Sequence, residues 1–419
     1  MADWQNWSGS VQGRPAEVYR PTALAELQAI IARAAKVRVV GAGHSFMPLC
    51  ETDGSLLQLG QLDVPLEIAP NRKTVWAPAG WGLNRLTKTL WDEGLSLINQ
   101  GDINPQALAG AIATGTHGTG AELGSMSTAA RAFRFVGPSG EILTCSATEA
   151  PNLFAAQRLS LGMMGVVTQI EIDVLPAYYL DQKIRKVPLA QAVEEFDDLA
   201  ATHRHAEFFV FPYSDEVILK TLHPTDEQRP ARDPNPNEDD AFQICCDIGR
   251  ALPFLIGPLQ RFMMRAIGSH RKIGPAYSIF PSERAVRFEE MEYEMPRAAG
   301  LSTLVEAITW MRKARLPVAF PFEFRWTAAD DLWLSPFNKG PGASISMHQY
   351  ARMSWRKLFV EGEAIFQGAG GRPHWAKRHT LSRADVDRLY PQAEAFRAER
   401  RALDPDGKFL NAHLGELFS

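Results

Sequence analysis

The sequence is poor in cysteine, and its few cysteines form no recognisable site. Cys50, Cys145, Cys245 and Cys246 are the only four among 419 residues, and none has the spacing of a CxxC or Cys/His metal motif. We interpret the adjacent pair, Cys245 and Cys246, as small buried hydrophobic residues. The pattern argues against a disulfide scaffold, gives no reason to expect a metal and fits a reducing compartment.

The chain also lacks an excess of positive charge. Its 44 Lys and Arg residues face 48 Asp and Glu residues, which gives a net charge of −4. A nucleic-acid partner would require a basic stripe, so we expect none.

Long apolar runs are missing as well. No stretch of about 20 apolar residues exists, and the N-terminus lacks the basic start and apolar run of a signal peptide. The closest approach, residues 251–267, is interrupted by Pro253, Pro258 and two arginines. We therefore expect a cytoplasmic protein without a transmembrane helix, whose membrane contact is at most peripheral.

The remaining composition is that of a globular protein, with 45% hydrophobic and 22% charged residues, long enough for two or three domains. Up to residue 176 the pattern alternates between helices and short strands, and there we place a domain boundary. We expect one helix to begin at Thr22, as its N-cap, and a second helix to cover 82–93. Expected strands cover 37–40, 56–59, 74–77, 132–136, 142–144 and 166–174. Further on we expect a polar, proline-rich loop at 229–240 and a charged helix at 385–401.

The first segment that can carry chemistry is the run RVVGAGHSF, residues 38–46. A strand enters a glycine turn whose backbone N–H groups can cradle a pyrophosphate. It is neither a Rossmann fingerprint, because position 46 is phenylalanine, nor a P-loop, because GK[ST] is missing. A structural turn would explain the glycines alone, but His44 adds a nucleophilic imidazole beside the turn.

A second segment, GDINPQALAGAIATGTHGTG at 101–120, holds five glycines and four alanines. Such a run makes a poor helix but lets the backbone approach a flat ligand closely. A close-packed core turn is the alternative.

The third segment is Glu323–Phe324–Arg325. On a strand, residues two apart share a side, so the carboxylate and the guanidinium face one space. An exposed ion pair is the alternative, but the surrounding Phe and Trp residues are too apolar for a surface site. His348 and Tyr350 alternate in the same way.

These segments, in this order, resemble the vanillyl-alcohol-oxidase-like flavoproteins, and within them the sugar-1,4-lactone oxidases. LGMMGVVT at 161–168, GGRPHWAK at 370–377 and the segment 404–418 extend the resemblance over nearly the whole chain. It implies an α+β protein with a two-subdomain α/β FAD-binding domain of the PCMH type at 1–176. A cap domain at 177–419 follows, whose last ~20 residues return to the flavin.

The resemblance implies FAD as cofactor, bound covalently through His44. The other cofactor-binding positions it implies are Gly41, Ala42, Gly43, Ser45, Phe46, Gly101, Asp102, Gly110, Thr114, Gly115, His117, Gly118, Gly162, Gly165 and Val166. It implies catalytic roles for Glu323, Arg325, Lys377 and His348, and substrate contacts for Asp102, Glu323, Arg325 and Tyr350. Lys377 would stabilise negative charge at the N1–C2 edge of the flavin.

The implied reaction is hydride transfer from a secondary carbinol of a sugar 1,4-lactone, similar to L-gulono-1,4-lactone, to flavin N5. Gly101 stands where the plant galactonolactone dehydrogenase has an alanine thought to block oxygen. We therefore favour O2 as acceptor, giving H2O2, over a cytochrome or dye. Oxidation of an open-chain alditol or of another sugar remains an alternative substrate reading. A flavin-binding electron-transfer partner is the non-enzymatic alternative. Three charged residues facing one apolar pocket, Glu323, Arg325 and Lys377, disfavour it, because a binding module does not need them.

Overall fold

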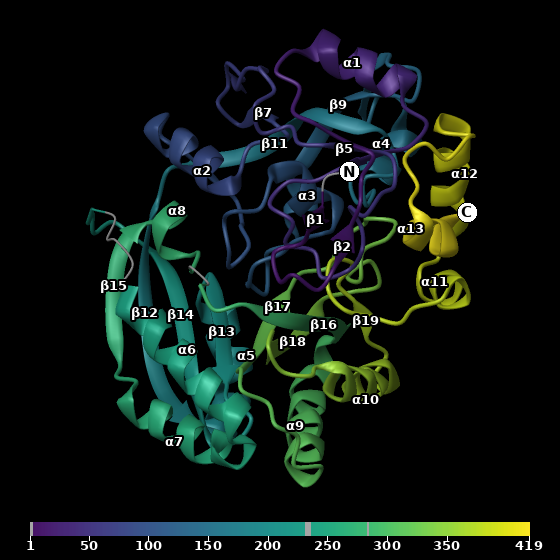
Figure 1. The fold of residues 1–419 in the computed structure, drawn as a ribbon. Helices are drawn as coiled ribbons and strands as arrows, with labels where there is room; N and C mark the ends of the chain where they lie inside the picture. The colour runs from purple at the N-terminus through teal and green to yellow at the C-terminus, as the bar shows by residue number, and fades with distance from the viewer. Residues whose placement is uncertain (1–2, 231–235, 283–284) are drawn as a thin grey trace.

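The protein folds into two lobes that lie against each other (Figure 1). The computed structural model describes residues 3–230, 236–282 and 285–419. The upper lobe in the view contains the N-terminal part of the chain together with the C-terminal helices. The lower lobe contains the middle of the chain, drawn in teal and green.

The first lobe contains a small parallel sheet of three strands in the order β3 (Glu17–Tyr19), β5 (Ser55–Leu57) and β4 (Val37–Val39). Helix α1 (Leu24–Arg33) buries Leu27, Ile30 and Ile31 beside it. The expected N-cap at Thr22 is wrong, because the helix starts after Ala23 without a side-chain cap. Glu26 instead accepts a hydrogen bond from the backbone N–H of Thr22 at 2.9 Å.

A second, antiparallel sheet completes this lobe. Its order is β10-β9-β11-β7-β6, and β8 also pairs with β11. The expected hairpin at the turn 137–140 is confirmed as the pair β9–β10. The strands are β6 (Glu67–Ile68), β7 (Thr74–Pro78), β8 (Leu95–Leu97), β9 (Ala130–Val136), β10 (Ile142–Ser146) and β11 (Val166–Pro176). The other elements of this lobe are helices α2 (Leu83–Asp92), α3 (Leu108–Ala113) and α4 (Pro151–Gln157), the 3-10 turn η1 (Met126–Ala129) and the short pair β1 (Trp4–Gln5) and β2 (Gln12–Gly13).

The second lobe is built on an antiparallel sheet of eight strands in the order β15-β12-β14-β13-β17-β18-β16-β19. Helices α5 (Leu189–Thr202), α9 (Arg297–Lys313) and α10 (Arg356–Gly368) supply side chains to the apolar core on one face. The strands are β12 (Tyr179–Pro188), β13 (His205–Val210), β14 (Glu216–Thr225), β15 (His270–Pro275), β16 (Phe288–Pro296), β17 (Phe322–Thr327), β18 (Gly342–Tyr350) and β19 (Arg372–Pro373).

The two faces of this sheet differ in polarity because side chains alternate along each strand. On β17, Phe322, Phe324 and Trp326 enter the apolar core, whereas Glu323 and Arg325 face the other side. That other side faces the first lobe, since Gly120 of the first lobe forms a bridge with Thr327. The sheet therefore presents a polar face to the glycine-rich segments.

Two expectations about the later elements are wrong. The loop expected at 229–240 falls partly outside the described residues, and helix α6 (Pro236–Ala251) already begins within it. Proline is tolerated at the start of a helix because the backbone N–H of that position makes no intrahelical hydrogen bond. The charged helix expected at 385–401 is two helices, α11 (Arg383–Leu389) and α12 (Ala393–Leu403). Pro391 separates them, because proline cannot continue the hydrogen-bond ladder.

The remaining elements are η2 (Pro253–Leu255), α7 (Ile256–Ala266), α8 (Ala276–Ile279) and α13 (Ala412–Phe418). Leu414, Leu417 and Phe418 of α13 pack in one cluster with first-lobe residues such as Met47. The C-terminus thus returns to the first lobe. The division at residue 176 stays a prediction; β11 and β12 lie on its two sides, in different sheets. Among the described residues, no helix is both long and apolar enough to cross a membrane.

Candidate active site at the lobe interface

The polar face of the large sheet is built by strand register. Lys220, Glu207, Arg325, Ser344 and Glu294 are successive cross-strand partners on β14, β13, β17, β18 and β16. Positions two and four residues along these strands add further polar groups, namely Glu290, Glu292, Glu323, Ser346 and His348. All ten side chains are buried, so their interactions decide which of them carry charge.

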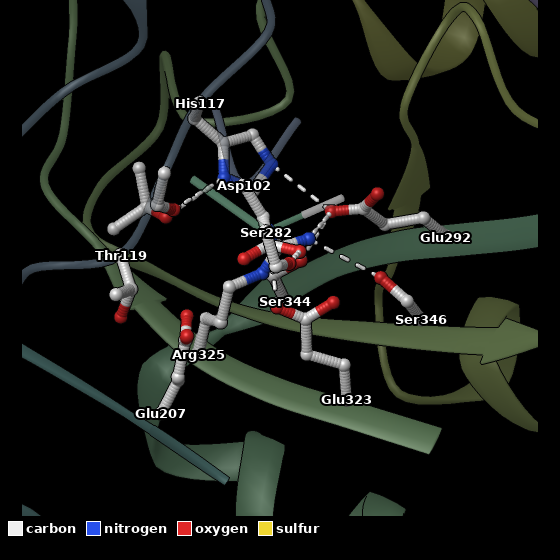
Figure 2. Close-up of polar contacts among 12 residues, drawn as sticks. Asp102, His117, Thr119, Glu207, Ser282, Glu292, Glu323, Arg325, Ser344 and Ser346 are labelled. Atoms are coloured by element: carbon white, nitrogen blue, oxygen red, sulfur yellow. Dashed lines mark hydrogen bonds and ion pairs between the residues drawn. The ribbon is translucent and has the colours of Figure 1, made fainter. Parts of the chain in front are cut away.

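Arg325 lies at the centre of this face (Figure 2). Its Nη2 is 2.5 Å from Oε1 of Glu292 and 3.2 Å from Oγ of Ser346, and its Nη1 is 3.5 Å from Oε1 of Glu323. The expected placement of Glu323 and Arg325 on one side of a strand is confirmed. Burial disfavours the ionised carboxyl and raises the pKa of Glu323. Arg325 lowers this pKa and the nearby Glu207 and Asp102 raise it, so that it reaches about 7.

His117 reaches this face from the second glycine-rich segment. Its Nε2 lies 3.1 Å from a carboxylate oxygen of Glu292 and of Glu294, and its Nδ1 is 2.9 Å from the Gly118 carbonyl. Burial opposes the charge, but the two carboxylates outweigh it and raise the pKa of His117 to about 10. The ring is therefore an imidazolium that donates from both nitrogens. Although these three side chains cluster closely enough to hold a metal, a protonated imidazole offers no lone pair to one.

The charges on this face can be compared directly. The acidic groups are Asp102, Glu207, Glu290, Glu292, Glu294 and Glu323; the cations are Lys220, Arg325, Lys377 and His117. Carboxyl groups thus exceed these cations by two. In agreement, burial raises the pKa of Glu294 and Glu323, whereas Lys377 and Arg325 hold those of Glu290 and Glu292 low.

The first glycine segment meets the HWAK segment at one edge of the polar face. The backbone N–H of Phe46 donates to the Ala376 carbonyl at 2.7 Å, and Nζ of Lys377 lies 5.2 Å from the centre of the Phe46 ring. Lys377 forms an ion pair with Glu290, and its Nζ is 3.9 Å from Glu292, the partner of Arg325. The structure thus brings Lys377 and Arg325 to a shared carboxylate.

His44 is half-buried in this same segment. Its ring stacks on Trp7 with a centroid distance of 5.0 Å and an interplanar angle of 28°. Burial, with a contribution from Lys377 and against a smaller one from Glu290, lowers the pKa of His44 to about 4. The imidazole is therefore neutral at physiological pH, which is its nucleophilic form.

The two glycine-rich segments lie against each other with bare backbone outward. A Cβ on Gly41 would lie 2.5 Å from Cβ of Ala107, whereas a Cβ on Gly110 would meet nothing within 4 Å. Gly41, Ala42 and Gly110 are exposed. Close backbone approach, small residues and a neutral imidazole are the features that an extended dinucleotide with a flavin ring requires. The residues present therefore fit FAD.

Other predicted cofactor positions serve local packing. A Cβ on Gly118 would lie 2.2 Å from the Gln100 carbonyl, and one on Gly165 would lie 2.8 Å from Phe135 and from the carbonyl of Val136. The remaining positions lie around these: Gly43 and Ser45 follow Gly41, Thr114 and Gly115 follow α3, Gly162 packs on the Arg38 guanidinium, and Val166 begins β11. Their contacts with a cofactor stay predictions.

The predicted substrate residues are only partly together. Asp102 lies on the polar face, where its Oδ2 accepts a hydrogen bond from Oγ of Ser282 at 2.7 Å. His348 lies on the same face, with its Nε2 3.4 Å from Glu290. The hydroxyl of Tyr350 instead donates to Asp247 of α6 at 2.8 Å.

Sequence reasoning missed the glutamates of β16 and the pair Glu207 and Lys220. The alternation Glu290, Glu292, Glu294 in a strand-like run was a usable signal, because it places three carboxylates on one side. The pair carried no such signal, since Glu207 and Lys220 become neighbours only through the register of β13 and β14.

Comparison with known proteins defines the class. Residues 15–146 match the family model described as an FAD binding domain. The structure of cholesterol oxidase from Brevibacterium sterolicum superposes with a TM-score of 0.86 over 100% of this chain and 96% of that one, at 16% identity. The fold is that of this flavoprotein group, and the protein is an FAD-dependent oxidoreductase.

The second half of the chain identifies the family. Residues 170–417 match the model described as D-arabinono-1,4-lactone oxidase. The chain is 38% identical to the L-gulono-1,4-lactone dehydrogenase of Mycobacterium tuberculosis over 97% of both chains. It is 29% identical to the L-gulonolactone oxidase of Bos taurus over 99% of this chain and 98% of the other. The protein belongs to the D-arabinono-1,4-lactone oxidase family, as its motifs predicted.

Proposed function

We propose that the protein oxidises a sugar 1,4-lactone, of the type of L-gulono-1,4-lactone, at a secondary carbinol carbon. The observation that carries the proposal is the buried Glu323–Arg325 pair, linked through Glu292 to Lys377 and so to the segment that holds His44. FAD, when bound, supplies the hydride acceptor and passes the electrons on. The rest of the chemistry belongs to the side chains of the polar face.

Each of these side chains has a defined task. Arg325 donates hydrogen bonds to the substrate oxygen and holds the carbinol in place. Glu323, whose pKa of about 7 is close to a working pH, orients the hydroxyl group and accepts its proton as the C–H bond breaks. Lys377 supplies positive charge where negative charge develops, and His348 extends the polar lining beside Glu290.

We further propose that a ring nitrogen of His44 is bonded to the 8α carbon of the flavin. Forming that bond removes one C–H proton, one N–H proton and two electrons, which pass to the electron acceptor of the enzyme. The low pKa and the half-buried position of His44 support this role. Acid precipitation tests it: yellow colour in the pellet supports the bond, and colour released into the supernatant, as expected for His44→Ala, refutes it.

For the electron acceptor we propose O2, with H2O2 as product. The support is Gly101, which stands where the plant dehydrogenase has an alanine thought to block oxygen. Gly101 is buried, and a Cβ there would lie 3.0 Å from Cγ2 of Thr116, in the segment that carries predicted flavin contacts. The added methyl group would therefore press on that segment.

The first experiment is the flavin spectrum without air, on addition of L-gulono-1,4-lactone. Bleaching, followed by rapid recovery and peroxide when air is admitted, supports a lactone oxidase. Bleaching with slow recovery keeps the lactone but replaces O2 by another acceptor. Absence of bleaching refutes the lactone and directs attention to alditols.

We also propose a cytoplasmic location with membrane contact that is peripheral at most, through residues 251–267. Phe254 and Phe262 are 75% and 66% exposed there, close to the exposed Arg261 and Arg265. Sedimentation with anionic vesicles, compared with zwitterionic ones, tests this contact. Loss of the cosedimentation in Phe254→Ser is expected, and no binding by the unmodified chain refutes it.

A further inference from the structure

Lys220 is a further cation on the polar face, and the proposed reaction leaves it unused. Its Nζ lies 2.8 Å from Oε1 of Glu207, 3.5 Å from Oδ1 of Asp102 and 3.3 Å from the Phe280 carbonyl. Lys220 and Glu207 belong to the sheet, whereas Asp102 comes from the first lobe. Three charged groups from both lobes thus meet at one place.

This cluster adjoins the proposed site of oxidation. Glu207 is the cross-strand partner of Arg325, and Figure 2 shows Asp102, Ser282, Glu207 and Glu323 gathered around Arg325. Asp102 directly follows Gly101 in the segment whose next part, 108–118, carries the predicted flavin contacts. A substrate held by Arg325 therefore has Glu207 and Lys220 within reach of its remaining atoms.

Glu207 of the cluster and the adjacent Glu323 each keep one carboxylate oxygen that can accept a further hydrogen bond. Oε2 of Glu207 and Oε1 of Glu323 are buried and receive no hydrogen bond within the described part of the chain. A buried acceptor without a donor costs free energy, about 1–3 kcal/mol for each group. Hydroxyl groups of a ligand supply such donors, and their oxygens can in turn accept hydrogen bonds from Nζ of Lys220.

We propose that Glu207, Lys220 and Asp102 form the subsite that binds the exocyclic hydroxyl groups of the sugar lactone. The inference rests on the proposed function, because it needs the lactone ring to be held at Arg325. The side chain of L-gulono-1,4-lactone carries two hydroxyl groups, which match the pair of carboxylate acceptors and the ammonium donor. Glu207 and Lys220 are therefore residues that determine specificity.

The test compares two lactones that differ only in the side chain. L-Erythrono-1,4-lactone has the same ring and ring hydroxyls as L-gulono-1,4-lactone but no exocyclic carbon. The measured quantity is the ratio of kcat/KM for the longer lactone to that for the shorter one. If the shorter lactone is not turned over, the ratio of its inhibition constant to the KM of the longer lactone is measured instead.

Lys220→Met and Glu207→Gln should each lower this ratio at least about 10-fold, because each removes a hydrogen bond to a charged group. The loss should lie in KM of the longer lactone rather than in kcat. Lys186→Met is the matched control: its Nζ donates to the Met264 carbonyl at 3.0 Å, outside the cluster. It should leave the ratio unchanged.

Folding is checked by retained flavin absorbance and a cooperative unfolding curve. If either single variant fails to fold, the double variant Glu207→Gln/Lys220→Met removes both charges together and takes its place. Folded variants that lose the same factor with both lactones, and so keep the ratio, overturn the subsite alone. A parent enzyme that neither lactone reduces or inhibits overturns the proposed function, and the subsite with it.

Discussion

Replacing Arg325 with methionine should separate the structural and chemical parts of the site. The substitution keeps much of the side-chain volume but removes the partner of Glu292 at 2.5 Å and of Glu323 at 3.5 Å. Removing one member of a buried ion pair costs about 3–5 kcal/mol, because the other charge stays buried. Removing one preorganised donor slows a reaction by about 10²–10³. Both effects are expected in Arg325→Met.

A second variant distinguishes the two effects. In Arg325→Met/Glu292→Gln the lost positive charge is matched by a lost negative charge, so most of the stability should return. The rate of flavin bleaching by the lactone should stay low, because the neutral amide introduced at position 292 cannot replace the guanidinium at the substrate. Arg397→Met is the control: this buried arginine contacts Asp387 at 2.5 Å and Glu394 at 2.9 Å in another part of the fold.

The assay is stopped-flow bleaching of the flavin without oxygen, with urea unfolding of the same preparations. Arg397→Met should lose stability but bleach at the rate of the parent enzyme. A rate constant of Arg325→Met within about threefold of the parent would refute the assignment of Arg325. Recovery of both stability and rate in the double variant would show that the arginine acts only through charge balance.

Three further predictions concern other residues. Arg38→Met should lower the unfolding free energy by at least about 3 kcal/mol in urea titrations, since its buried guanidinium donates four hydrogen bonds to carbonyls of three separate segments. A loss below about 1 kcal/mol, as expected for the exposed Arg383→Met, would contradict this. His117 has a pKa raised from 6.5 to about 10, so its stabilising effect is complete below pH 6.5 and is lost as the pH rises through 10. His117→Gln should flatten the alkaline decline in stability, and an unchanged pH profile would refute the imidazolium. Gly101→Ala should slow reoxidation by air more than bleaching by lactone, and equal effects on both steps would remove Gly101 from the oxygen path.

Local patterns predicted much of the fold. The apolar face of α1, the helix expected at 82–93 and observed as α2, and the hairpin at 137–140 all follow from spacing within ten residues, and the structure has them. The errors have local causes as well. Thr22 could cap a helix, but α1 starts one residue later, after Ala23, and Pro391 breaks a charged pattern that reads as continuous.

The site residues, too, could be predicted from the sequence only where they are close together along the chain. Glu323 and Arg325 could be paired from their spacing alone, because alternation on one strand is local. Their partners could not be identified, because Glu292, Glu207 and His117 arrive from three other segments through strand register and lobe contact. Tyr350 shows the converse: alternation placed it correctly beside His348, but only the fold shows that its hydroxyl binds Asp247.

The balance of charge at the lobe interface links these observations. A strand that carries three buried glutamates would be unstable in isolation, so the second lobe can form its polar face only when cations oppose it. Two of those cations, Arg325 and Lys220, belong to the sheet, whereas His117 comes from the first lobe and Lys377 from the segment that contacts Phe46. Contact between the two lobes therefore adds opposing positive charge to the face and brings the residues of the site together. The two surplus carboxyl groups keep raised pKa values, and one of them, Glu323, is the group to which we assign the substrate proton. Burial of Glu323, together with the neighbouring carboxyl groups of Glu207 and Asp102, is thus what makes Glu323 basic enough to accept a proton near neutral pH.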